Sequence, residues 1–154
     1  IGCSETGFTA QTKTISNGQT VCVRHTASAA AGATVTTTLS IGGINGTFSS
    51  TTVAPDTTPD SFAFTAQTGV ALSTKATSNT IVISGLAAAA PISVSGGTYS
   101  IGCSATGFTA QAKTISNGQS VCVRHVSSAN AATTVTTMLS IGGVSGDFSS
   151  TTAP

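Results

Sequence analysis

The sequence has very few charged residues and few large aromatic ones. Only 6% of its 154 residues are Asp, Glu, Lys or Arg, against about 25% in ordinary soluble domains. The chain has one tyrosine and no tryptophan. Its five basic residues are scattered, so no basic stripe follows a phosphate backbone, and we expect no nucleic-acid partner. Serine and threonine hydroxyls, instead of charges, must hydrate the surface.

Long hydrophobic runs are also missing. The longest strictly apolar stretch lies around Leu86 to Pro91, far below the roughly 20 residues of a membrane-spanning helix. We therefore expect no membrane insertion within this segment. The chain starts at Ile1 without a charged and apolar leader, so we expect any secretion signal or anchor to lie outside it.

What the sequence does contain is a long internal repeat. Residues 1–52 and 101–152 align without gaps and differ at 12 of 52 positions. Self-similarity at a fixed long period indicates a tandem array of whole domains. The proline-containing stretch TTVAPDTTPD, residues 51–60, predicts a linker between repeats. Residues 56–154 then form one complete repeat, and residues 1–55 form the C-terminal half of another, whose front half is missing or is supplied by a neighbour.

Short runs with period-two alternation, separated by Gly, Asn, Ser and Pro, predict an all-β fold of antiparallel strands. About seven strands are expected in the complete unit: 61–66, 80–85, 92–95 continuing through 99–103, 108–115, 120–127, 135–141 and 147–152. Hairpin turns are predicted at 116–118 and 142–146, where Asn and Gly tolerate positive φ. Alternation places a set of apolar side chains inward, namely Phe62, Phe64, Ile81, Ile83, Val121, Val123, Val135, Leu139, Ile141 and Phe148.

The pattern as a whole resembles a known kind of repeat. The segments DTTPD, FAFTAQTGVALST, SNTIVISG, PISVSGGTYSIG, SNGQSVCVRH and LSIGGVSGDFSSTT are similar to the tandem immunoglobulin-like or fibronectin-III-like repeats of large secreted bacterial proteins. This resemblance implies an immunoglobulin-like β-sandwich exported to the cell surface. It implies no particular site, because such modules serve as stalks, fibre subunits and adhesin extenders.

The cysteines recur as a pair. Cys3 and Cys22 are repeated as Cys103 and Cys122, which predicts one disulfide inside each repeat. Because Val121 and Val123 are assigned to the core, Cys122 is expected to face outward. Disulfides of this kind persist in oxidising compartments, so the sequence predicts a secreted or cell-surface protein.

Metal sites are the alternative use of some of these residues. Cys22 with His25, and Cys122 with His125, lack the four closely spaced ligands of a structural zinc site, so we expect no zinc and no cofactor. Asp56 and Asp60 could contribute to a calcium site in the linker, but calcium needs six to eight oxygens. The alternative is that Asp56 caps a turn.

No pattern indicates catalysis. Glu5 becomes Ala105 and Thr47 becomes Asp147, so no acid pair recurs between the copies. His125 could activate a hydroxyl, but no acid is evident to orient it, and we expect it at the rim of the core. The sequence therefore predicts a non-enzyme.

Two roles remain. The first is a structural module of a stalk or filament, whose partners are flanking repeats or copies of itself. The second is an adhesin module that binds glycan or another surface ligand, although the exposed aromatics that sugar platforms use are scarce.

Overall fold

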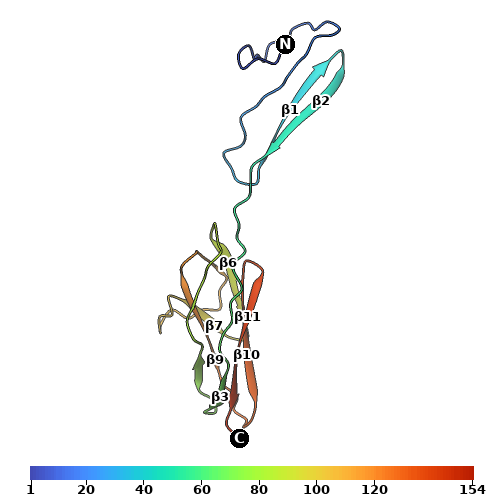
Figure 1. Ribbon diagram of the computed structural model, residues 1–154. Coiled ribbons are helices and arrows are strands. Elements are labelled where there is room, and N and C mark those ends of the chain that lie inside the picture. Colours follow the sequence, from blue (N-terminus) through green and yellow to red (C-terminus); the bar gives the residue numbers. More distant parts are fainter. The chain divides into compact units, whose positions relative to one another are not determined.

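The computed structural model describes all 154 residues and contains strands but no helix (Figure 1). The all-β prediction is therefore confirmed. The chain divides into two compact units, Ile1–Pro55 and Asp56–Pro154, which we call unit 1 and unit 2. Each unit is described by itself.

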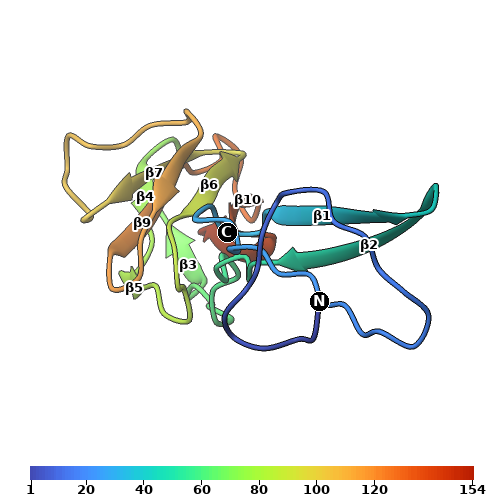
Figure 2. The same cartoon turned by 90° about the horizontal axis from the view of Figure 1, so that it is seen from above.

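Unit 2 contains nine strands in two sheets. They are β3 (Gln67–Val70), β4 (Lys75–Thr77), β5 (Ile81–Val82), β6 (Ala90–Ser95), β7 (Thr98–Ile101), β8 (Lys113–Ile115), β9 (Ser120–Val126), β10 (Thr134–Ile141) and β11 (Val144–Thr152). One sheet has the order β3-β11-β10-β6-β8, and in the other β9 pairs with β4, β5 and β7. Seen from above, the two groups of strands lie on opposite sides of unit 2 (Figure 2). This arrangement is consistent with a β-sandwich.

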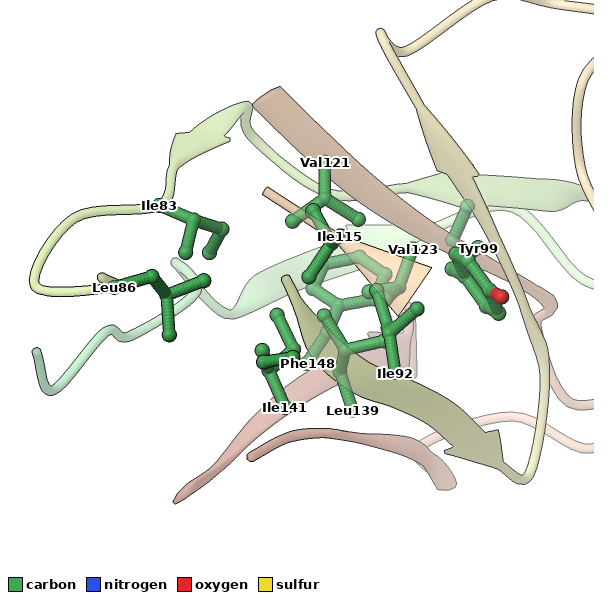
Figure 3. Packing of buried hydrophobic residues seen from close by; sticks show 12 residues of the cluster. Ile83, Leu86, Ile92, Tyr99, Ile115, Val121, Val123, Leu139, Ile141 and Phe148 are labelled. Atoms are coloured by element: carbon green, nitrogen blue, oxygen red, sulfur yellow. The ribbon is translucent and has the colours of Figure 1, made fainter. Parts of the chain in front are cut away.

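The core of unit 2 receives side chains from both sheets (Figure 3). Fully buried residues come from β6, β8, β10 and β11 in one sheet and from β7 and β9 in the other. They include Ile92, Tyr99, Val121, Val123, Leu139, Ile141 and Phe148. The alternation along β9, β10 and β11 predicted this face correctly. It did not identify Ile92, Tyr99 and Ile115, which are equally buried.

Several predicted strands differ from the observed ones. Residues 61–66 form no strand, although Phe62 and Phe64 still pack against the core. Strand β8 covers only the end of the predicted strand 108–115. Two short strands, β3 and β4, were not predicted, because four and three residues are too few for a clear period. The complete unit therefore has nine strands where about seven were expected.

One of the two predicted hairpins is real. Strands β10 and β11 are antiparallel and join through Gly142 and Gly143, with Ile141 opposite Val144. The turn at 116–118 does not close a hairpin, because β8 pairs with β6 and β9 belongs to the other sheet. That turn carries the chain from one sheet to the other. Neighbouring β6 and β7 also belong to different sheets, and Gly97 lies between them where a Cβ would meet Thr137 Oγ1 at 2.5 Å.

Unit 1 has only two strands. β1 (Thr34–Ile41) and β2 (Ile44–Thr51) form an antiparallel hairpin in the same register as β10 and β11. Residues 1–33 form no strand, including those that correspond to β8 and β9. In unit 2 those strands pair with β4, β5, β6 and β7, and of these partners unit 1 contains only Ile1, the counterpart of Ile101 at the end of β7.

Candidate functional sites: disulfides and a histidine between two hydroxyls

A disulfide joins Cys103 to Cys122 in unit 2, and another joins Cys3 to Cys22 in unit 1. Both have a Cα–Cα distance of 5.2 Å, and no cysteine is free. Cys122 is only 4% exposed, although it lies outside the core cluster that contains its strand neighbours Val121 and Val123. The disulfide and the Thr80 hydroxyl, whose Oγ1 lies 3.4 Å from the Cys122 Sγ, help to cover it.

The two disulfides indicate an oxidising compartment, since reducing compartments keep such thiols unpaired. They also remove the cysteines as metal ligands, because a metal binds the free thiolate.

His125 lies between two hydroxyl side chains, which the sequence did not reveal. Its Nδ1 is 2.8 Å from Thr137 Oγ1 and its Nε2 is 2.7 Å from Ser150 Oγ. The ring stacks on Phe148, with 4.9 Å between centroids. β9, β10 and β11 supply these four residues, so the cluster ties the two sheets of unit 2 together.

Unit 1 repeats the histidine cluster. His25 Nδ1 is 2.9 Å from Thr37 Oγ1, its Nε2 is 2.6 Å from Ser50 Oγ, and its ring centroid is 4.8 Å from that of Phe48. The cluster thus forms although the segment around His25 is not a strand, unlike β9 around His125. The signal in the sequence was the presence of all four residues in both copies, at the same spacing.

A histidine beside a serine can be a nucleophile and its base, but the surroundings of His125 favour a structural role. Ser150 and Thr137 are fully buried, so neither oxygen reaches a substrate on the surface. The second ring nitrogen faces a hydroxyl, where a catalytic triad has a carboxylate. Burial lowers the pKa of His125, which favours the neutral ring over the charged one. A neutral ring can donate one hydrogen bond and accept another.

An arginine stacked on a phenylalanine also recurs. The Arg124 guanidinium carbon lies 3.6 Å from the centre of the Phe108 ring, and Arg24 lies 4.1 Å from that of Phe8. Arg124 Nε also donates a hydrogen bond to Thr77 Oγ1. This contact fastens the irregular loop before β8 to β9 and β4. Sequence reasoning missed it because the two residues are far apart in the chain.

Asp56 and Asp60, the candidate calcium ligands, accept hydrogen bonds within unit 2. Asp56 Oδ1 accepts from the backbone N–H of Thr58 at 2.8 Å, as expected of a turn cap. Asp60 Oδ2 accepts from the Ser84 hydroxyl at 2.7 Å. No three His, Cys, Asp or Glu side chains come together as a metal-binding group.

Comparisons with protein-family models, curated proteins and solved structures found no match to this chain. No helix of the structure has the length and apolar character needed to cross a membrane.

Proposed function

We propose that the chain belongs to a secreted or cell-surface structural protein, in which immunoglobulin-like β-sandwich modules follow one another and carry tension along a stalk or filament. The observation that carries this proposal is the parallel pairing of the first strand of unit 2 with its last strand. Ser150 is opposite Gln67 and Thr151 is opposite Thr68 in β11 and β3.

The parallel contact begins well before β3. The chain enters unit 2 beside the β10–β11 turn, where a Cβ on Gly142 would collide with Thr57. A Cβ on Gly146 would similarly meet the Phe62 ring. Phe64 then packs edge-on against Phe148, with 6.5 Å between centroids. The entering segment therefore runs along the whole of β11, in the same direction.

This geometry places the two ends of unit 2 at opposite ends of β11. The strand has nine residues and so spans about 30 Å. A force that pulls the two ends apart slides β3 along β11. It loads their cross-strand hydrogen bonds together, whereas an antiparallel hairpin pulled at one end would open bond by bond. Such a module resists tension along its length, as a stalk requires.

The composition and the cross-link support the same role. The disulfide between Cys103 and Cys122 has a sequence separation of 19 residues, so that loop cannot extend under force. The near-identical repeat suits serial or head-to-tail assembly. A surface of hydroxyls with few charges suits contact with further copies or flanking modules.

Single-molecule pulling on the whole chain, held at its two termini, tests the proposal. We expect unit 2 to unfold in one distinct rupture event. The chain should then lengthen by the extended length of unit 2, except for the loop that the Cys103–Cys122 disulfide keeps closed. Reduction should lengthen that release by about 60 Å, the extent of the freed loop. A second pulling geometry attaches the handles at Ala132 and Ala153, whose backbone N–H and C=O pair at 3.0 Å at one end of the β10–β11 hairpin. Unfolding in this geometry should need less force than pulling at the two termini. Equal rupture forces in the two pulling geometries would refute the proposed role in carrying tension.

A further inference from the structure

Unit 1 exposes apolar side chains that are fully buried in unit 2. The exposed fractions of Val21, Ile41 and Phe48 are 36%, 40% and 44%, whereas their counterparts Val121, Ile141 and Phe148 are at 0%. The local sequence around each pair is nearly the same. The difference therefore comes from what covers them.

In unit 2 the cover is the segment Asp56–Ser100. Its side chains Ile83, Leu86 and Ile92 pack in the same core cluster as Val121, Ile141 and Phe148 (Figure 3). Its backbone pairs with the same strands: Ile81 lies opposite Val121, and Ile92 lies opposite Ile141. Unit 1 contains no such segment.

The uncovered face of unit 1 forms a groove of about 1030 Å³. Its apolar lining residues include Phe8, Ile15, Val21, Val23, Leu39 and Ile41. Five of the corresponding residues are fully buried in the core of unit 2, namely Ile115, Val121, Val123, Leu139 and Ile141. The groove is therefore the core-facing side of a module without its other half.

Unit 1 keeps the internal contacts that shape this face. The Gly2 N–H donates to the Thr20 carbonyl at 2.9 Å, as Gly102 does to Ser120 at 2.8 Å. The disulfide and the histidine cluster are also present in both units. The half module is thus cross-linked in the arrangement that the complete module uses.

We propose that the groove of unit 1 binds a polypeptide segment with the apolar and strand pattern of Asp56–Ser100, and that this segment completes unit 1 by adding strands to it. A second copy of these 154 residues cannot be the general source. Each copy has two groove-bearing halves, 1–55 and 101–154, and only one covering segment, 56–100. If the covering segment of one copy moved onto unit 1 of another copy, it would leave residues 101–154 of its own copy uncovered. The covering segment must therefore come from polypeptide outside these residues.

Placing a second copy of Asp56–Ser100 directly before Ile1 tests this inference, because Ser100 is followed in the chain by Ile101, the counterpart of Ile1. Hydrogen exchange is measured residue by residue in this extended chain and in the 154-residue chain. We expect the amides of Val21 and Val23 to exchange at least about a thousandfold more slowly in the extended chain, as strand amides in a stable domain do. Their rates should then match those of Val121 and Val123.

The matched control carries aspartate in place of Ile83 and Ile92 in the added copy only. This control should leave Val21 and Val23 exchanging as fast as in the 154-residue chain, because buried unpaired charges prevent docking. Unchanged exchange in the unmodified extended chain would overturn the inference. Protection in the 154-residue chain that increases with its concentration would also overturn it, since a second copy would then be the occupant. No force is applied in this experiment, so its result is independent of the proposal that unit 2 carries tension.

Discussion

Phe148 and Phe48 occupy matching positions in nearly identical sequences, but only Phe148 is fully buried. Phe148 contacts the His125 ring at 4.9 Å and the Phe64 ring at 6.5 Å between centroids. Replacing such a residue by alanine costs about 3–5 kcal/mol. That cost is a large part of the total stability of a domain, about 5–15 kcal/mol. We therefore predict that Phe148→Ala strongly destabilises unit 2.

The chain offers a convenient assay for this prediction. Tyr99 is its only tyrosine and there is no tryptophan, so the intrinsic fluorescence reports on unit 2 alone. With a urea dependence of about 1–3 kcal/mol per molar, Phe148→Ala should lower the urea midpoint by at least about 1 M. Phe48→Ala is the matched control, and it should leave the midpoint nearly unchanged. Similar shifts for the two variants would refute the assignment of Phe148 to the core.

Three further predictions use the same fluorescence. Replacing Cys103 and Cys122 together by alanine should lower the stability of unit 2 by about 3 kcal/mol, because the disulfide closes a loop with a sequence separation of 19; an unchanged urea midpoint would contradict this. Burial lowers the pKa of His125 from its ordinary value of 6.5, so the unfolded chain binds the proton more tightly than the folded one. The stability of unit 2 should therefore fall as the pH drops below about 6.5. His125→Gln should flatten this pH dependence, and an unaltered slope would argue against His125 as its source. Gly142→Ala should destabilise more than Gly143→Ala, since both have positive φ but only a Cβ at the first meets the backbone; equal urea midpoints would count against this contact.

Much of the fold of unit 2 was predictable from local patterns. The alternation in β10 and β11 identified both strands and their inward side chains, and the two glycines between them indicated the hairpin. The paired cysteines pointed to one disulfide in each repeat. The histidine cluster and the arginine–phenylalanine contact could not be predicted, because their members come together only when distant segments pack.

Unit 1 shows most clearly which features the local sequence determines and which features depend on tertiary packing. The hairpin β1–β2 forms in unit 1 as β10–β11 does in unit 2, because both of its strands are contained in the repeated sequence. Residues 20–26 and strand β9 (Ser120–Val126) differ at only two positions, but only β9 is a strand. The strands that pair with β9 all lie in residues 75–101, and unit 1 has no equivalent of most of that segment. The sequence by itself determined the local hairpin, the inward faces and the cysteine pairs. Whether a β-prone segment becomes a buried strand was decided only by the tertiary structure, because a strand needs a neighbour to satisfy its backbone hydrogen bonds.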